Sequence, residues 1–484
     1  MVAKWELHMF RGYEAVIGLE VHAQLKTQSK IFSADPTNFD ALDNQNTSPV
    51  TLGMPGTLPV LNEQSVRLAI VTGLALGCSI RKKSVFSRKN YFYPDLPKGY
   101  QISQYDEPIC EHGFLEIQSE LGPKKIKILR AHLEEDAGKS THHGEFTLLN
   151  YNRAGVPLLE IVSEPDLRTP VEAAEYARTL RQILQYVESC DGNLEEGSLR
   201  CDCNVSVRKI GETKLGTKVE IKNINSFRFI EKAIEYEIER QIDEVEAGRN
   251  IIQETRLYDP DKNRTFTMRT KENAEDYRYF PDPDILPLVI PEGLIDQVKA
   301  SIPPLPQERI RIYTQKLGLS DYDAKVLTET RALADYFEMT AELSKKPKEA
   351  ANWIMNELLR ELKSNPQKLT EIKVTPQHLA ELIDLVDKSV ISGKIAKAVF
   401  SEVWASGQNP KSIVNTKGLG QISDESALEK IVDRVLADNE KTVIEYKSGK
   451  TKLLGFFVGA IMKETKGQAS PEVVNKLLQK KLNG

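Results

Sequence analysis

Carboxylates occur in this sequence at positions where a β-strand normally carries apolar side chains. The stretch from Ile126 to Asp166 contains three runs of branched and large apolar residues, each bounded by turn-forming residues, and it therefore predicts three strands. Glu134, Glu135 and Asp136 end the first run, and Glu160 lies inside the third. A buried carboxylate destabilises a fold unless a positive group pairs with it. Hard divalent cations are the commonest reason to gather several such oxygens.

Further predicted strands offer side chains of the same kind. In residues 13–25 the side chains alternate between two faces, so Glu20 and His22 share one face. Residues 198–208 and 217–223 are read as two more strands. Together the predicted strands supply these candidate metal ligands: Glu20, His22, Glu134, Glu135, Glu160, Asp202 and Glu220.

The composition of this set favours one kind of metal. Oxygen-rich ligand sets with at most one imidazole favour Mg²⁺ or Mn²⁺ over zinc, and such sites usually hold nucleotide phosphates. Taken singly, each residue is better explained as a surface or ion-pair group. Taken together on one sheet, they indicate a metal-dependent enzyme that could use a nucleotide.

Residues 87–105 mix tyrosines with basic side chains, among them Lys89 and Tyr91. The prolines and glycine of this segment exclude a regular helix. Basic and aromatic side chains together can hold a nucleotide or an RNA end through stacking and charge. A well-packed irregular loop explains the segment equally well.

Charge is distributed unevenly along the chain. The net charge is −5, yet residues 411–484 carry 13 Lys and Arg against 9 Asp and Glu. An acidic body with a basic tail is compatible with a metal-binding core and a polyanion-binding appendage, and a chance fluctuation explains it equally well. The 5 cysteines lack framework spacing, and we find neither a signal-like N-terminus nor an apolar run of about 18 residues. We therefore expect a cytoplasmic protein without a membrane span.

The sequence predicts about three domains. Strand-like runs, with helices expected at about 62–76, after Thr169 and at 226–247, fill residues 1–292. A proline-rich run then marks a boundary, and helical periodicity dominates residues 293–408. A linker-like Gln408-Asn409-Pro410 precedes a small helical tail over residues 409–484. The fold class expected is α+β, followed by an all-α helical domain and a helical tail domain.

Several longer strings carry a resemblance to a known family. The chain resembles the B subunit of the glutamyl- and aspartyl-tRNA amidotransferases, the GatB family, along almost its whole length; only the residues before Tyr13 lie outside the match. The strings are GLEVHAQL (18–25), RKNYFYPDLPKGYQISQ (88–104), HLEEDAGK (132–139), YNRAGVPLLEIVSEPD (151–166), EEGSLRCDCNVS (195–206), EIKNINSF (220–227) and YRYFPDPD (277–284).

The resemblance implies a fold, a reaction and partners. The fold is an antiparallel-sheet cradle domain similar to that of glutamine synthetase and the guanidino kinases. In the reaction, ATP with Mg²⁺ or Mn²⁺ phosphorylates the side-chain carboxylate of Glu-tRNA(Gln) or Asp-tRNA(Asn), and ammonia then displaces the phosphate. The partners, in a heterotrimer, are the amidase (the A subunit), which sends ammonia through a channel, and a small third protein (the C subunit). The basic tail would bind the tRNA.

We assign roles to individual residues on this basis. Glu20, His22 and Glu134 are expected around one cation, and Glu135, Glu160 and Glu220 around the other, while Asp202 could serve either. The residues expected to be catalytic are Lys89, Tyr91, Glu135 and Glu160, with Lys89 and Tyr91 at the channel mouth. Those expected to bind the nucleotide are Arg200, Lys222 and Asn223. The competing hypothesis is a non-catalytic scaffold that presents tRNA and whose carboxylates only form ion pairs.

Overall fold

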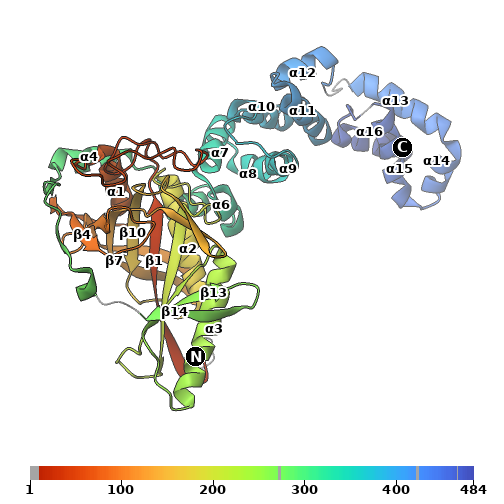
Figure 1. Ribbon diagram of the computed structural model, residues 1–484. Helices are drawn as coiled ribbons and strands as arrows, with labels where there is room; N and C mark the ends of the chain where they lie inside the picture. Colours follow the sequence, from red (N-terminus) through yellow and green to blue (C-terminus); the bar gives the residue numbers. More distant parts are fainter. Residues whose placement is uncertain (1–9, 271–273, 421–424, 466, 484) are drawn as a thin grey trace. The chain divides into compact units, whose positions relative to one another are not determined.

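The computed structural model describes residues 10–270, 274–420, 425–465 and 467–483. The chain divides after Pro306 into two compact units, and each is described here by itself. The first unit is a mixed α+β structure built on one large sheet, and the second is helical (Figure 1). This agrees with the predicted fold class. The finer division into three domains, with boundaries after residues 292 and 408, remains a prediction.

The large sheet is organised around β1 (Tyr13–Gln24). β1 pairs antiparallel with β11 (Leu199–Lys209) on one side and with β10 (Pro157–Ser163) on the other, so segments far apart in the sequence lie side by side. The strands follow the order β14, β13, β12, β11, β1, β10, β7, β5, β4, β15. Neighbours along this path run antiparallel, except for the parallel pair β12 and β13.

The other strands of the sheet are β2 (Ser79–Ile80), β4 (Ser87–Asn90), β5 (Tyr100–Ser103), β6 (Cys110–Ser119), β7 (Gly122–Glu135), β12 (Val219–Lys222), β13 (Glu254–Asp259), β14 (Arg264–Thr270) and β15 (Phe280–Pro281). β6 pairs with both β2 and β7. Two small sheets accompany it: β8 (Lys139–His143) with β9 (Phe146–Asn150), and β3 (Lys83–Ser84) with β16 (Leu288–Val289). The strands predicted around Glu20, Glu134, Glu160, Asp202 and Glu220 are confirmed.

Three helices pack against the strands of the sheet: α1 (Glu63–Ala75), α2 (Pro170–Tyr186) and α3 (Phe227–Glu246). Each begins where an N-cap side chain accepts a hydrogen bond from the first turn: Asn62 for α1, Thr169 for α2 and Ser226 for α3. These caps confirm the three helices predicted for this part of the chain. A shorter helix, α4 (Glu292–Ser301), follows near the end of the first unit.

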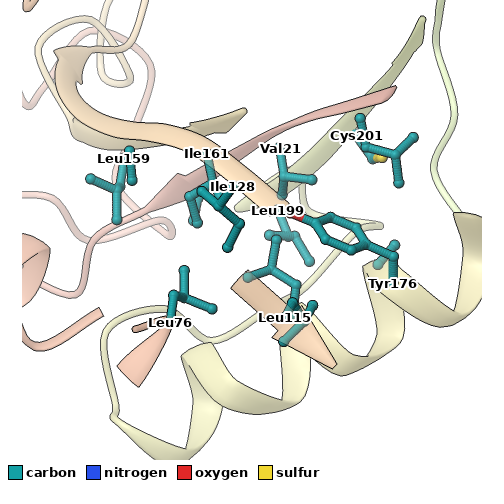
Figure 2. Close-up of a cluster of buried hydrophobic side chains, with 14 of the residues drawn as sticks. Val21, Leu76, Leu115, Ile128, Leu159, Ile161, Tyr176, Leu199 and Cys201 are labelled. Atoms are coloured by element: carbon teal, nitrogen blue, oxygen red, sulfur yellow. The ribbon is translucent and has the colours of Figure 1, made fainter. Parts of the chain in front are cut away.

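The core lies between these helices and one face of the sheet. Figure 2 shows Val21 of β1, Ile161 of β10 and Leu199 of β11 on the same side as Tyr176 of α2. Tyr176 and Ile161 are fully buried. Because successive side chains of a strand alternate, burying Val21 in this core directs its neighbours Glu20 and His22 to the opposite face. The core therefore decides which residues are available for chemistry.

The second unit consists of helices: α5 (Pro306–Gln315), α6 (Asp321–Leu327), α7 (Arg331–Ser344), α8 (Pro347–Trp353), a π-helical turn (Ile354–Leu358), α9 (Leu359–Ser364), α10 (Pro376–Asp387), α11 (Gly393–Ser406), α12 (Pro410–Lys417), α13 (Glu425–Asp438), α14 (Glu440–Lys447), α15 (Leu454–Glu464) and α16 (Pro471–Asn483). Two separate apolar clusters hold it together, one spanning residues 313–414 and the other residues 428–482. None of the helices in the described part of the chain has the length and apolarity that crossing a bilayer requires.

Candidate metal centre

The face of the sheet opposite the core carries ionisable side chains from five neighbouring strands, β12, β11, β1, β10 and β7. Strand register brings them together. Glu20 lies opposite Asp202 of β11, and His22 lies opposite both Arg200 of β11 and Glu160 of β10. Residues directly opposite in an antiparallel pair have Cβ atoms about 4.5–5.5 Å apart. We call this surface the cradle face.

His22 is at the centre of the cradle face. Its Nε2 lies 3.3 Å from Oε2 of Glu160 and 3.7 Å from Oε1 of Glu20. Two groups of possible ligand atoms meet there, each with its atoms within 4.8 Å of one another: Glu20, His22 and Asp202, and His22, Glu134 and Glu160. His22 belongs to both groups. The structure thus places Asp202 beside Glu20, one of the two positions that the sequence hypothesis left open for it. It also places Glu160 beside Glu134, whereas that hypothesis assigned these two residues to different cations.

The electrostatics of the cradle face are those of a site with too much negative charge. Burial, reinforced by the charge of Glu160, raises the pKa of Glu20 to about 7. For His22, burial by itself lowers the pKa, but the hydrogen bond and charge of Glu160, together with Glu20, outweigh it and raise the pKa to about 9. A bound cation would neutralise the negative charge that helps burial to raise the pKa of Glu20 and that raises the pKa of His22.

Glu134 is held by a buried polar shell. His132 Nε2 lies 3.0 Å from Oε1 of Glu134, Ser103 donates to the same oxygen over 3.0 Å, and Gln101 donates to Oε2 over 2.8 Å. Burial raises the pKa of Glu134, but His132 and Lys89 outweigh that effect and hold it well below its usual range. The carboxylate is therefore ionised and fixed in orientation.

Sequence reasoning missed His132. Its Nε2 is also 3.6 Å from Oε2 of Glu160, so it touches both carboxylates of the second group. Its Nδ1 is buried without a hydrogen-bond partner, which leaves one polar atom of the centre unsatisfied. The spacing of His132 two residues before Glu134 was the available signal, because such residues share a face of a strand.

Glu220 and Lys222 extend the cradle face onto β12. Lys222 Nζ lies 2.5 Å from Oδ2 of Asp202 and 3.8 Å from Oε1 of Glu220, and Thr255 donates to Oε2 of Glu220 over 2.8 Å. Burial lowers the pKa of Lys222, but Asp202 and Glu220 outweigh it and raise the pKa. Lys222 thus supplies positive charge at the edge of the centre, and the role of Glu220 as a ligand remains a prediction.

Glu135 lies apart from both ligand groups. Lys98 Nζ lies 2.5 Å and 2.7 Å from its two carboxylate oxygens, and the backbone N–H of Ile102 donates to Oε1 over 2.8 Å. As the neighbour of Glu134 on the same strand, Glu135 points to the other side. Its roles as ligand and catalytic residue therefore remain predictions, and its observed partner is the partly buried ammonium group of Lys98.

A cavity of about 380 Å³ opens beside the carboxylates. Lys89 lines it, with Nζ 5.0 Å from the ring centre of Tyr277 and 5.9 Å from that of Tyr91. Burial lowers the pKa of Lys89, but the charges of Glu134 and Glu160 outweigh it and raise the pKa. The cavity therefore holds a permanent positive charge next to the acidic cluster, where a carboxylate substrate would be attracted.

The residues predicted to bind the nucleotide lie in different places. Arg200 is on the cradle face, with Nη2 3.1 Å from Oδ1 of Asp136. Asn223 follows β12 in a left-handed conformation, with φ of 67°, and its Nδ2 donates to the backbone oxygen of Tyr258 over 3.0 Å. Lys222 contacts the acidic cluster as described. Nucleotide binding by these residues remains a prediction.

The donor set suits a hard divalent cation. It combines carboxylates from separate strands with one imidazole, and Glu20 has a raised pKa that a positive ion would lower. Glu20, His22 and Asp202 would hold one such ion, and His22, Glu134 and Glu160 another or the same one. Such ions hold nucleotide phosphates in many enzymes.

A model of the GatB/GatE catalytic domain matches residues 15–296, and a model described as the GatB domain matches residues 335–482. The chain belongs to the GatB family. A relative from Bdellovibrio bacteriovorus is 63% identical over 98% of this chain and 99% of its own. Relatives from Geotalea daltonii and Solidesulfovibrio magneticus are each 55% identical, over 98% and 97% of this chain and 100% and 99% of their own. All three are named as the B subunit of an aspartyl/glutamyl-tRNA(Asn/Gln) amidotransferase.

The segment that matches the GatB/GatE catalytic domain contains the candidate metal centre. Every residue of both ligand groups lies inside the segment that matches the GatB/GatE catalytic domain. The second GatB match falls in the helical unit. The resemblance identified from short sequence strings is therefore confirmed at the level of the family.

Proposed function

We propose that this chain is the amidating subunit of a glutamine-dependent tRNA amidotransferase, a ligase that forms a carbon–nitrogen bond. It would phosphorylate the side-chain carboxylate of Glu-tRNA(Gln) or Asp-tRNA(Asn) with ATP and then convert the acyl phosphate to the amide. The observation that carries the proposal is the meeting of carboxylates from separate strands around His22, beside a cavity that contains Lys89. The names of the relatives support the choice of substrate.

Charge is the main obstacle to the first step. A substrate carboxylate must approach the γ-phosphate of ATP, and both are anions. Phosphoryl transfer depends more on positioning and charge neutralisation than on covalent help from the protein. Divalent cations, when bound, would supply that neutralisation. Lys89 would attract the substrate carboxylate into the cavity that it lines beside the acidic cluster.

The proposed reaction balances in two steps. A carboxylate oxygen of the substrate forms a bond to the γ-phosphorus, and the bond between that phosphorus and the β–γ bridging oxygen breaks, releasing ADP. The nitrogen of ammonia then bonds to the acyl carbon, the phosphate leaves with the former carboxylate oxygen, and one proton is lost to phosphate or water. Tyr91 and Tyr277 flank Lys89, and such apolar walls would keep water from hydrolysing the acyl phosphate.

Partners and architecture extend the proposal. We expect the amidase partner, the A subunit, to deliver ammonia through a channel that opens near Lys89 and Tyr91, with the small C subunit completing a heterotrimer. The basic segment 409–484 would bind the tRNA, as a third domain after residues 1–292 and 293–408. The largely antiparallel sheet with one open acidic face supports a likeness to glutamine synthetase and the guanidino kinases.

Glu160→Gln tests the proposal. ATP-dependent amidation of Glu-tRNA(Gln) with ammonium chloride, measured in the assembled complex, should fall by at least about 100-fold, because a ligand and a negative charge are lost. The control is Glu120→Gln, an exposed glutamate between β6 and β7, which should retain full activity. Glu135→Gln is expected to abolish amidation as well.

The same experiment addresses the scaffold hypothesis. tRNA affinity should be largely unchanged in Glu160→Gln, because the segment proposed to bind the tRNA is 409–484. Undiminished amidation in this variant, with normal tRNA binding, would show that the carboxylates serve ion pairing alone and that the chain is a scaffold.

A further inference from the structure

Arg130 is a cationic side chain of β7 that the structure leaves without an anionic partner. It lies two residues before His132, so both side chains point to the cradle face, about 7 Å apart along the strand. Its Nε is buried and has no hydrogen-bond partner among the described residues. Its Nη1 donates over a long 3.4 Å to the backbone oxygen of Tyr105. A buried donor in this state lowers stability and requires an explanation.

The neighbouring strands offer Arg130 no free carboxylate. The residue opposite it on β10 is Val162, whose side chain is apolar. The residue opposite it on β6 is Glu111, but Arg81 binds that carboxylate, with Nη1 at 3.2 Å and 3.1 Å from its two oxygens. Within the part of the chain that the structure describes, Arg130 therefore forms no ion pair.

Arg130 instead lines the cavity of about 380 Å³ that also contains Lys89, called here the Lys89 cavity. The ammonium group of Lys89 lies near the rings of Tyr91 and Tyr277, and it too forms no ion pair with a described residue. An anion that enters the Lys89 cavity would therefore meet two cations whose charge no bound carboxylate neutralises.

We propose that Arg130 binds the side-chain carboxylate of the aminoacyl group and orients it for phosphorylation. This rests on the proposed function and separates two roles, since Lys89 attracts the acceptor and Arg130 holds it. A planar guanidinium group presents paired N–H donors that match the two oxygens of a carboxylate, whereas an ammonium group acts as a point charge. A carboxylate has about four lone-pair sites, so one that accepts two N–H bonds keeps lone pairs for attack on the γ-phosphorus.

The position of Arg130 suits this role. His132, the next residue of β7 on the same face, has its Nε2 3.0 Å from Oε1 of Glu134 and 3.6 Å from Oε2 of Glu160. The carboxylates of the candidate metal centre thus begin about 7 Å further along the strand. In-line transfer requires the phosphorus to lie between the attacking and the leaving oxygen, and this separation leaves room for it.

The end of the Lys89 cavity that holds Arg130 is fixed by contacts between its walls. Tyr105, whose backbone oxygen accepts from Arg130, stacks on Tyr279 with ring centres 4.0 Å apart and planes at 6°. Asn90 Nδ2 donates to the backbone oxygen of Tyr277 over 3.1 Å, which ties the segment of both tyrosines to β4. A site fixed before binding loses less entropy when its ligand arrives.

Arg130→Met tests the proposal, because it removes the charge and keeps a long side chain. The affinities of the assembled complex for Glu-tRNA(Gln) and for its amide product Gln-tRNA(Gln) are measured with Mg²⁺ and without ATP. The affinity for Glu-tRNA(Gln) should fall at least about 10-fold, because a charge-assisted pair is lost. The affinities for Gln-tRNA(Gln), which lacks the carboxylate, and for ATP should not change. The control is Arg178→Met, which removes an arginine of α2 paired with Glu231 and should keep all three affinities.

Two further measurements distinguish substrate binding from a structural role. The urea midpoint of Arg130→Met should equal or exceed that of the wild type, because the variant removes a buried donor that has no partner. In Arg130→Ala, free guanidinium ion at low concentration should restore part of the amidation rate. The same ion should not restore amidation in Glu160→Gln.

The outcomes separate this proposal from the proposed function. If Arg130→Met leaves both tRNA affinities unchanged, or lowers both equally while the wild type amidates normally, the proposal alone is overturned. A selective loss of affinity for ATP would assign Arg130 to the nucleotide and overturn it as well. Absence of ATP-dependent amidation by the wild-type complex would instead overturn the proposed function.

Discussion

Proton competition offers the most direct test of the metal centre. A divalent cation requires His22 to be neutral and Glu20 to be ionised. Burial and the charge of Glu160 raise the pKa of Glu20 to about 7, and in His22 the lowering by burial is outweighed by Glu160 and Glu20, so that its pKa is about 9. Both groups hold a proton below their pKa and must release it when the cation binds. Protons therefore oppose binding, and affinity should increase with pH.

The two pKa values define the size of this effect. Between pH 7 and pH 9 His22 is the group that must lose a proton, so affinity should increase about 10-fold per pH unit. Below pH 7 Glu20 adds a second proton, so the dependence should approach about 100-fold per pH unit. Above pH 9 the affinity should level off.

Mn²⁺ binding to the full chain can be followed by electron paramagnetic resonance of the free ion between about pH 6 and pH 8.5, where Mn²⁺ stays soluble and both groups titrate. Calorimetry in two buffers of different ionisation enthalpy would count the protons released. His22→Asn should weaken binding and flatten the dependence above pH 7. The control is His142→Asn, which changes an exposed histidine of β8 and should keep the wild-type profile.

Two results would refute this reasoning. One is an affinity for Mn²⁺ that does not change with pH in the wild type and is accompanied by no proton release. The other is an unchanged pH profile in His22→Asn, which would place the cation elsewhere.

Three other predictions concern stability and RNA binding. Ile161→Ala, which empties part of the core in Figure 2, should lower the unfolding free energy in urea by about 2–5 kcal/mol; an equal loss in Val162→Ala, which points to the other face, would contradict the core assignment. Lys98→Met should lower the unfolding free energy by about 3–5 kcal/mol, because it leaves the buried Glu135 without its positive partner. The double variant Lys98→Met/Glu135→Leu should recover most of this loss. No recovery would mean that packing, rather than charge, explains the loss. Deleting residues 411–484 should weaken tRNA binding in a filter assay at fixed salt while ATP binding persists, and unchanged tRNA affinity would remove this segment from RNA recognition.

The sequence was most informative where alternation and composition coincide. Glu20 and His22 could be placed on one face because apolar residues occupy the positions between and around them in β1. Capping residues likewise predicted the start of α2 at Pro170, after Thr169. Such features depend on neighbours within a few residues of one another, and a single sequence displays them directly.

What the sequence could not provide is register between distant strands. That Asp202 lies opposite Glu20, and Glu160 opposite His22, follows from pairings between segments more than a hundred residues apart. The partner of Glu135 was hidden for a related reason. Lys98 approaches it from a separate loop, and adjacency to Glu134 in the sequence suggested a shared role that alternation along a strand opposes.

Register also links folding to catalysis in this sheet. The side chains of β1 alternate between two faces. A shift of β1 by one residue against β10 and β11 would therefore expose Leu19 and Val21 to water and bury Glu20 and His22 in the hydrophobic core. A misaligned sheet could not persist as an inactive but stable molecule. In this sheet, the strand register that buries the core also forms the candidate metal centre. A test of correct folding here is therefore also a test of whether the site is formed.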